Sequence, residues 1–412
     1  MKSFRLCISG GRYAALFCFL LAMPPVARAW AQPPPETLLR LICWQNEDEK
    51  MIGSVDLLAG FTEMNPGLRV NLTYDRWPQA YPRLKYWTGT LRNYAPDMTV
   101  VRDVWLSQFP DMFLQLDGKL IGSDLQGVTP AVLDRCRING KLLGIPWMAT
   151  ARVLYCRADL LETAKLQPPA TLEQLRATAK ALTTEGVAGL GLPAAPGGGA
   201  VDAYMALLWA HGGQAVVDGK LALKTDEATQ ALQYWLDLQR DGVCEPEALS
   251  WTSADLDEAF AAGKLGMVFS GPALGKYLRR ARPNLQFVTV PLPRAQAQPA
   301  QISSNALVIL SSTKHPEECV RFLRYMVSQQ AQRAMWLMGG LPTHQQQVAE
   351  ARQDPLQRAF VEHLGNAQGL PLQQAERLTA VVERALWLGL SGRMDAKTAL
   401  RTALGEDEVS LP

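Results

Sequence analysis

The chain has 412 residues, of which 48% are hydrophobic and 19% charged, and its formal net charge is +2. Residues 1–35 hold four of the 41 basic side chains and no acidic one. The rest of the chain therefore has 37 basic and 39 acidic residues, which gives a net charge of −2. This balance excludes electrostatic recruitment to nucleic acid or to an anionic membrane surface. The length exceeds what one hydrophobic core usually supports, so we expect two lobes.

The first residues have the pattern of a secretory signal. Basic residues at positions 2, 5 and 12 precede an apolar run from Ala14 to Met23, and small residues follow at Ala29 and Ala31. The run is shorter than the roughly 20 residues of a membrane span, and no cysteine follows it at the spacing of a lipoprotein anchor. We therefore predict that residues 1–31 are a signal peptide and that the protein is exported to the periplasm.

The next part of the chain alternates between strand and helix patterns. Leu68, Val70, Leu72 and Tyr74 alternate with polar residues, which marks a half-exposed strand. The predicted elements are a strand at 38–44, a helix at 48–64, a strand at 68–74, a helix at 79–93 and a strand at 98–102. This βαβαβ order predicts a parallel sheet with right-handed crossovers.

A longer segment at residues 141–161, KLLGIPWMATARVLYCRADLL, changes character along its length. It begins with a turn that contains Gly and Pro, continues through small and polar residues around Thr150, and becomes apolar from Val153 to Cys156. β-branched and aromatic residues flanked by Gly and Pro favour a strand. We expect this strand to leave one core and enter another. The alternative is an ordinary internal strand of one large sheet.

Beyond this strand the chain again contains both helix and strand patterns. Helices are predicted at 171–183, 200–211 and 226–240. A strand from Leu265 to Phe269 leads to Ser270-Gly271-Pro272, where Pro suits the first position of a helix. The first turn of that helix offers free N–H donors to an oxygen-rich ligand. A second long strand is predicted at 301–310, and helices are predicted from Pro316 to about Gly405.

Large aromatic residues follow the strands of the predicted parallel sheet, at the edge where such sheets bind ligands. They are Trp44, Trp77 and Trp105, and Asp103 lies two residues before the last of them. Aromatic rings suit the apolar faces of a sugar, and a carboxylate suits its hydroxyl groups. Packing in the core is the alternative for any one of these tryptophans.

Sequence patterns of other functions are missing. The glycine-rich stretch at 194–200 lacks the GK[ST] ending of a phosphate-binding loop. The four histidines form no HExxH motif, and no G-x-S-x-G elbow occurs. We interpret the acids Asp255, Asp257 and Glu258 as a solvated helix face. Asp103 is then the one acid expected in a cleft, whereas a glycosidase needs two carboxylates there. We expect no enzyme activity, cofactor or metal.

Five cysteines follow the signal segment, at positions 43, 136, 156, 244 and 319. Their spacings are wide and no CxxC occurs. We expect most of them to be buried as small hydrophobic residues. One disulfide of unassigned pairing is the alternative in an oxidising compartment.

Several segments resemble the extracellular solute-binding proteins of family 1, the sugar-binding subunits of ABC importers that include maltose-binding protein. They are GFTEMNPGLRVNLTYDRWPQAYPRL, APDMTVVRDVWL, GKLLGIPWMATARVLYCRADLL and the stretch at 260–280, which is similar to the family's GKxAM…GPW pattern. The chain departs from the family pattern at Ala273, where an aromatic residue is usual, and at Thr150, where an acid is common.

The resemblance implies an α/β periplasmic-binding-protein fold of two lobes, each a mixed, mostly parallel sheet flanked by helices. Three hinge crossings are expected, near 148–151, 302–306 and 341–344. The first lobe would comprise residues 36–148 and 304–342, and the second residues 150–302 and 344–408. Ligand-binding residues expected from position and residue type are Trp44, Trp77, Asp103, Trp105, Trp147, Thr150, Arg152, Trp209, Trp251, Gly271, Asn305 and His344.

The function implied is capture of a carbohydrate, an oligosaccharide or related polyol, by hinge closure and its delivery to the membrane subunits of an ABC permease. A monomer is expected. Two other functions stay open: binding of an anionic solute such as a phosphorylated polyol, for which Arg152 is the reason, and a solute sensor that docks on a receptor. Turnover of a bound glycoside would be needed to support an enzyme.

Overall fold

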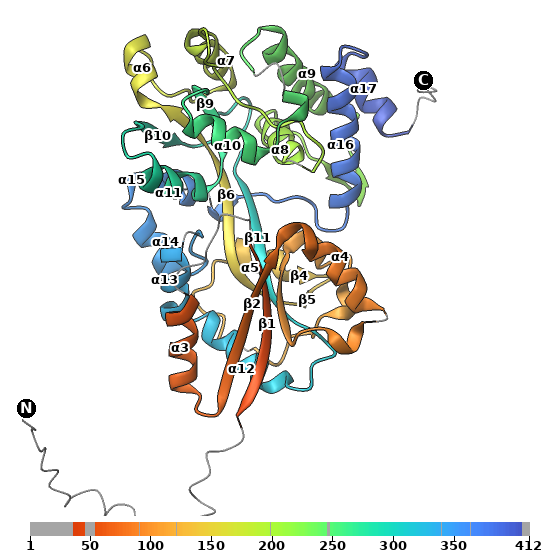
Figure 1. Cartoon of the computed structure of the whole chain (residues 1–412). Helices are drawn as coiled ribbons and strands as arrows, with labels where there is room; N and C mark the ends of the chain where they lie inside the picture. The colour runs from red at the N-terminus through yellow and green to blue at the C-terminus, as the bar shows by residue number, and fades with distance from the viewer. Residues whose placement is uncertain are drawn as a thin grey trace, which may run out of the picture.

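The computed structural model describes residues 36–45, 54–89, 91–120, 122–197, 199–244, 248–338, 340–362 and 364–405. The predicted signal peptide lies outside these residues. Two bodies of helices and strands are stacked end to end, and β6 (Ile145–Arg157) and β11 (Gln301–Ile309) run from one to the other (Figure 1). We call the body that holds the first strands the first lobe and the other the second lobe. Every helix in the described part is too short or too polar to span a bilayer.

The first lobe is built on the predicted βαβαβ unit. Strands β1 (Thr37–Gln45), β2 (Leu68–Arg76) and β3 (Met98–Arg102) are parallel, and β1 lies between the other two. Helices α3 (Ser54–Met64) and α4 (Trp77–Thr88) connect them. The strands and their direction confirm the prediction.

The helix limits in this unit differ from the prediction at two ends. Residues 48–53, predicted as the first turns of α3, lie outside the described residues, and α3 is described from Ser54. Helix α4 ends at Thr88 because Gly89 takes a non-helical conformation (φ −117°, ψ −123°). A separate turn of 3₁₀ helix follows at Arg92–Tyr94.

Strand β6 changes its partners halfway along. From Ile145 to Arg152 it pairs with β11, and from Val153 to Arg157 it pairs with β9 (Met267–Ser270) and β10 (Phe287–Val290). The change falls where the sequence turns from small and polar to apolar. Seven strands therefore form one continuous hydrogen-bonded sheet, in which β11 also pairs with β3.

We expected a mixed, mostly parallel sheet in each lobe, and the structure joins the strands of both lobes into one mixed sheet whose second-lobe part is antiparallel. Both β9 and β10 are antiparallel to β6, and in the second lobe parallel pairing between described residues occurs only as single bridges, such as Gly191 with Val268. The reason is that the 13-residue strand β6 pairs with β11 over its first part and then continues into the second lobe, where it pairs with β9 and β10. The strand leaves one core and enters another as predicted, because Trp147 packs in the first-lobe core and Leu154 in the second-lobe core.

The three expected crossing segments lie side by side at Ala149. This residue is in register with Ser304 of β11, and its carbonyl oxygen accepts the N–H of Leu341 at 3.0 Å. Residues from 148–151, 302–306 and 341–344 are thus hydrogen-bonded at one level between the lobes. Three connections side by side at one level suit a hinge, because a few residues at that level can absorb a rotation of one lobe relative to the other.

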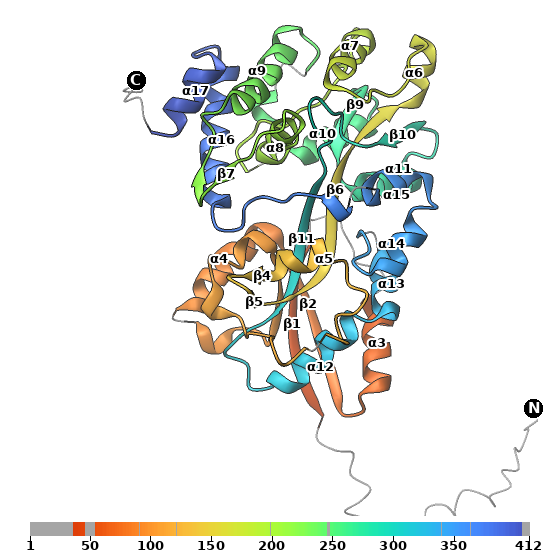
Figure 2. The ribbon, with the colours of Figure 1, turned by 180° about the vertical axis from the view of Figure 1, so that it is seen from behind.

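The second lobe is mainly helical. Some of its helices begin with side-chain caps, such as the Thr225 hydroxyl of α9 and the capping box of Thr252 and Asp255 in α10. Figure 2 shows its C-terminal helices against α8 and α9, and the connection between α15 and α16 at the level between the lobes.

The remaining helices and strands of both lobes are α5 (Pro130–Leu133), β4 (Arg137–Ile138), β5 (Lys141–Leu142), α6 (Ala158–Ala164), α7 (Leu172–Leu182), α8 (Ala200–Ala210), β7 (Val216–Val217), β8 (Lys220–Leu221), α9 (Asp226–Arg240), α10 (Ser253–Ala261), α11 (Pro272–Ala281), α12 (Pro316–Met326), α13 (Gln329–Met338), α14 (Gln345–Ala351), α15 (Pro355–Val361), α16 (Ala375–Leu390) and α17 (Ala396–Ala403).

Buried apolar side chains form three clusters. One fills the first lobe around Phe61 and Phe322, one fills the second lobe around Tyr204 and Trp235, and a third lies against the other face of β6 around Tyr155. Most of the five cysteines were predicted to be buried; all five are buried, and all are free thiols, so the alternative of a disulfide is not realised. Cysteine therefore serves this fold as a small core residue.

Candidate ligand-binding site

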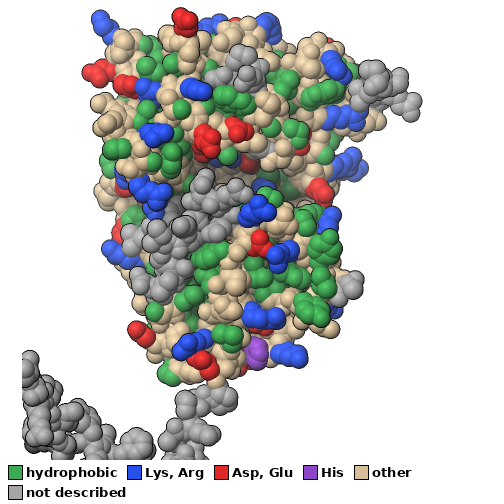
Figure 3. All heavy atoms as spheres, in the orientation of Figure 1, with side chains coloured by type: hydrophobic (Ala, Val, Ile, Leu, Met, Phe, Trp, Pro, Cys, Tyr) green, Lys and Arg blue, Asp and Glu red, His purple; other side chains and the backbone are tan. Residues whose placement is uncertain are grey.

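A cavity of about 170 Å³ lies at the point where β6 changes partners. Its walls are formed by residues of β6, α8, α10 and the β9–α11 segment, all on the second-lobe side. Two residues at the start of β11 complete the lining. Figure 3 shows one face of the molecule hollowed at mid-height, with acidic and basic side chains interspersed around it. The residues that line the cavity are Thr150, Ala151, Arg152, Asp202, Ser253, Asp257, Ser270, Gly271, Ala273, Leu274, Gln301 and Ser303.

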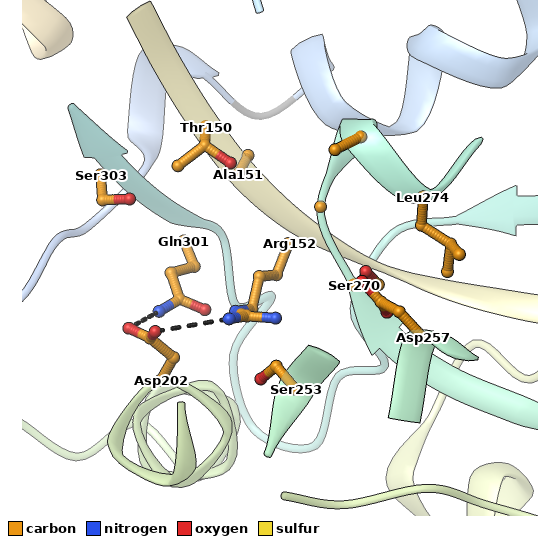
Figure 4. Close-up of a pocket in the computed structure, with 12 residues that line it drawn as sticks. Thr150, Ala151, Arg152, Asp202, Ser253, Asp257, Ser270, Leu274, Gln301 and Ser303 are labelled. Atoms are coloured by element: carbon orange, nitrogen blue, oxygen red, sulfur yellow. Dashed lines mark hydrogen bonds and ion pairs between the residues drawn. The ribbon is translucent and has the colours of Figure 1, made fainter. Parts of the chain in front are cut away.

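Arg152 occupies the middle of this cavity, with Asp202 on one side and Asp257 on the other (Figure 4). Its Nη2 lies 3.6 Å from an oxygen of Asp202, and its Nη1 donates to the carbonyl oxygen of Phe269 at 3.4 Å. The other oxygen of Asp202 accepts the side-chain amide of Gln301 at 2.8 Å. Asp202 and Arg152 therefore largely neutralise each other.

Asp257 is the less well compensated acid of the cavity. Its carboxyl is buried and accepts a hydrogen bond from the Ser270 hydroxyl, but its Oδ1 has no partner. Burial raises the pKa of Asp257 to about 6, and the Ser270 hydrogen bond and the Arg152 charge only partly oppose this effect. A carboxylate in this position gains from any ligand that donates a hydrogen bond to it.

Two further polar atoms in the cavity are buried without a partner, the hydroxyl oxygen of Ser253 and Oε1 of Gln301. Gly199, just before α8, has a φ of +95°, and a side chain there would collide with the Ser253 hydroxyl and approach Arg152. Glycine at this position thus satisfies the backbone conformation and keeps the space around Ser253 and Arg152 open.

Three of the residues expected to bind ligand meet in this cavity. They are Thr150, Arg152 and Gly271, and a side chain at Gly271 would lie 3.4 Å from the Thr150 hydroxyl. Ala273, one of the two departures from the family pattern, also lines it. The cavity wall therefore has a small residue at the position where an aromatic residue is usual in the family pattern, and its neighbours are polar.

Three of the predicted tryptophans are instead core residues. Trp44 and Trp147 belong to the first-lobe core and Trp209 to the second-lobe core, each with at most 5% of its surface exposed. The indole N–H of Trp44 donates to the carbonyl oxygen of Val100 at 2.6 Å. These three positions therefore follow the alternative interpretation, packing in the core, because their rings point into the interior of a lobe.

The expected role of Asp103 needs correction, since its carboxylate is 1% exposed and already occupied. It accepts Arg135 Nε–H at 2.7 Å and the backbone N–H groups of Val104 and Ser304 at 2.8 and 3.0 Å. Asp103 therefore joins the end of β3 to β11 as a buried structural carboxylate. It offers no free oxygen to a sugar hydroxyl.

Trp77 and Trp105 do come together, as half-buried residues in the first lobe. Their ring centroids are 6.2 Å apart, and Trp105 also lies 5.5 Å from the ring of Tyr81. Trp251 is half-buried too, but it packs against the third apolar cluster, and its carbonyl oxygen accepts the N–H groups of Ala194 and Ala195. The structure shows no contact of Trp251 with the other two rings.

The last two expected residues lie at the hinge level. Asn305 is half-buried in β11 and in register with Met148 of β6. His344 caps α14, where its Nδ1 accepts the N–H of Gln346 at 3.3 Å, and partial burial lowers its pKa. The ring of His344 also packs against Gly127, so its role here is structural.

Sequence analysis missed the acids and amide that give the cavity its character, Asp202, Asp257 and Gln301. The interpretation of Asp257 as part of a solvated helix face was wrong, whereas Asp255 caps its helix and Glu258 is exposed. One signal was present: Ser253 and Asp257 are four residues apart and so share a face of α10. Nothing in the sequence indicated that α8 and β11 would meet this face.

Comparisons with known proteins agree with this architecture. The family model described as bacterial extracellular solute-binding protein matches residues 56–359. A putative binding protein of Brucella abortus (strain 2308) is 27% identical over 286 residues, which are 66% of this chain and 67% of that protein. A probable ABC transporter-binding protein of Deinococcus radiodurans is 22% identical over 251 residues, 58% of this chain and 59% of that protein.

Solved structures show the same fold. The cyclic α-maltosyl-1,6-maltose binding protein of Arthrobacter globiformis matches 90% of this chain and 98% of its own, with a TM-score of 0.78 and 20% identity. An ABC transporter solute-binding protein of Agrobacterium radiobacter K84, solved with ribitol, matches 91% of this chain and 99% of its own, with a TM-score of 0.76 and 19% identity. At these identities the likeness concerns the two-lobed fold alone.

Proposed function

Because the chain belongs to the bacterial extracellular solute-binding proteins, we propose that it captures a small carbohydrate or polyol between its lobes and delivers it to an ABC permease. The family is extracellular, and the signal pattern of residues 1–31 supports release into the periplasm. The Deinococcus relative is named as an ABC transporter-binding protein, and the structural relatives bind a cyclic maltosaccharide and ribitol. We infer that this chain works as a monomer.

The observation that carries this proposal is the polar cavity beside the hinge. It lies within a few residues of the level at which β6 and β11 cross, and it is lined by hydroxyl, amide and carboxylate groups. Groups of this kind bind the hydroxyl rim of a polyol. The lining residues belong to the second lobe and to the hinge level, so the cavity would hold one end of the solute. A solute that also reached the first lobe would favour the closed arrangement over the open one, because those contacts exist only when the lobes approach.

The alternative of an anionic solute is less well supported. Arg152, the residue that kept it open, is engaged by Asp202 and by the carbonyl oxygen of Phe269. Asp257 adds a further negative charge beside it. A phosphate group in this cavity would meet two carboxylates and a single arginine that already pairs with one of them, so a neutral solute fits better.

The proposed function is tested by a thermal-shift screen of sugars and polyols with the protein lacking residues 1–31. A ligand present at 100 times its dissociation constant stabilises the folded state by about 2.7 kcal/mol, which gives a clear increase in melting temperature. Hits are then measured by isothermal titration calorimetry, and closure is measured as a decrease in the radius of gyration by X-ray scattering. Absence of a hit among mono-, di- and trisaccharides and their reduced polyols would contradict the proposal.

A further inference from the structure

The cavity carries an excess of negative charge. Asp202 and Asp257 are its acids and Arg152 is its one cation among the lining residues. Arg152 and Asp202 form an ion pair, and the amide of Gln301 supports Asp202, so the uncompensated charge belongs to Asp257. When the lobes close around a neutral ligand, this charge loses water without gaining an opposite charge, which is unfavourable.

The atoms in the cavity that still need partners are mostly acceptors. Asp257 Oδ1 and Gln301 Oε1 only accept hydrogen bonds, and the Ser253 hydroxyl can accept or donate. Arg152 approaches Asp202 with Nη2 and donates from Nη1 to the Phe269 carbonyl oxygen. A ligand that supplies donors therefore suits the acceptors without partners, whereas a phosphate or carboxylate would leave them without partners.

We propose that the cavity holds the protonated amino group of an amino sugar or amino polyol, with Asp257 as its carboxylate partner and the Ser253 hydroxyl as a further hydrogen-bond acceptor on the same side of Arg152 (Figure 4). An ammonium group has three donors and no acceptor, and it brings the positive charge that the cavity lacks. A hydroxyl group brings one donor and no charge. This inference rests on the proposed function and narrows its substrate class.

The size of the cavity agrees with one substituted end of a ligand. About 170 Å³ corresponds to the liquid volume of roughly five or six water molecules. Ala151 and Leu274 close its apolar side, and Thr150 and Ser303 stand at the hinge side, where the rest of a polyhydroxy chain or ring could extend. The amino group is then the anchored end, and the hydroxyl groups face the space between the lobes.

The test compares matched pairs of probes by isothermal titration calorimetry near neutral pH. The pairs are D-glucosamine with D-glucose, D-galactosamine with D-galactose, and 1-amino-1-deoxy-D-glucitol with D-glucitol. In at least one pair the amine should bind tenfold or more tightly than its hydroxyl counterpart. In the Asp257→Asn variant this advantage should disappear, so that the amine and its hydroxyl counterpart bind with affinities within about threefold of each other.

A control variant separates a local contact from a general effect of charge. Glu258→Gln removes the same charge from the next residue of α10, whose side chain is exposed, and it should keep the tenfold preference. Equal affinities within every pair, or a preference that survives Asp257→Asn, overturn the inference. If neutral sugars bind and no amine does, the inference fails and the proposed function stands; if no probe of either kind binds, both fail.

Discussion

Arg135 donates its Nε–H to the buried carboxylate of Asp103 at 2.7 Å, and the same guanidinium donates from Nη1 to the carbonyl oxygen of Leu370 at 2.8 Å. Asp103 directly follows β3 and also accepts the N–H of Ser304 in β11. Leu370 belongs to the connection between α15 and α16, which runs at the level between the lobes (Figure 2). One ion pair thus links the first lobe to the hinge and to a segment that leads into the second lobe.

Replacing Asp103 by Asn should destabilise the protein. The change leaves Arg135 partly buried without its counter-ion, and removing one partner of a buried pair typically destabilises by about 3 kcal/mol or more. Chemical denaturation followed by circular dichroism measures this loss. The control is Glu317→Gln, which breaks the exposed pair with Lys119 and should change stability by less than about 1 kcal/mol. Equal effects of the two changes would show that the Asp103 pair is not important to stability.

The charge on Arg152 should not attract anionic ligands. If D-glucitol binds, D-glucitol 6-phosphate should bind more weakly, and the affinity for D-glucitol should hardly depend on salt, because no net charge is neutralised. Titration calorimetry at two salt concentrations measures both effects. A phosphate ester that binds more tightly than its parent, with affinity that falls as salt rises and that Arg152→Lys greatly reduces, would restore the anionic alternative.

Trp105 and Trp44 should respond differently to substitution. Trp105→Ala removes a half-buried ring next to Trp77, and if this pair contacts the ligand, affinity should fall by about 2 kcal/mol. Trp44→Phe instead leaves the buried carbonyl oxygen of Val100 without its donor and should lower stability by about 1–3 kcal/mol with no change in affinity. Fluorescence quenching and calorimetry on the folded variants check these outcomes. An intact fold with unchanged affinity in Trp105→Ala would identify this ring as packing only.

Asp257 should make the ligand-free protein less stable as the pH rises. Because burial raises the pKa of Asp257 to about 6, the folded state holds the proton more tightly than the unfolded chain does, whose carboxyl titrates near the ordinary 3.8. Its stabilising effect is therefore complete at the acidic end of this window and is lost as the pH rises through about 6. One pKa unit corresponds to 1.36 kcal/mol, so the loss amounts to about 2–3 kcal/mol.

The measurement for Asp257 compares urea denaturation of the wild type and Asp257→Asn at pH 4 and pH 7. The variant should gain about 2–3 kcal/mol relative to the wild type between the two pH values, since its amide does not titrate. Glu258→Gln, on the exposed side of the same helix, should show no such gain. A constant difference between Asp257→Asn and the wild type would contradict the raised pKa.

The sequence by itself determined the local elements and the place of the hinge. Alternation around Val70 and the stop at Asn65-Pro66-Gly67 identified β2 and the end of α3, because period-two patterns and turn residues act over a few positions. The switch at Thr150 to Val153 marked where β6 changes partners, because each half of the strand must match the core that it enters. These features depend on neighbours in the chain, so they can be read without knowledge of the fold.

Only the tertiary structure decided which side chains form the site. Trp44 and Trp105 both lie near the C-terminal ends of parallel strands, yet one ring turns into the core and the other stays half-buried, and no local pattern separates them. Asp202, Asp257 and Gln301 are far apart in the sequence and meet because α8, α10 and β11 pack around β6. The residues that pack around a carboxylate decide whether it is solvated, paired or left with an oxygen that lacks a hydrogen-bond partner. For Asp103 and Asp257 these residues come from distant segments of the chain.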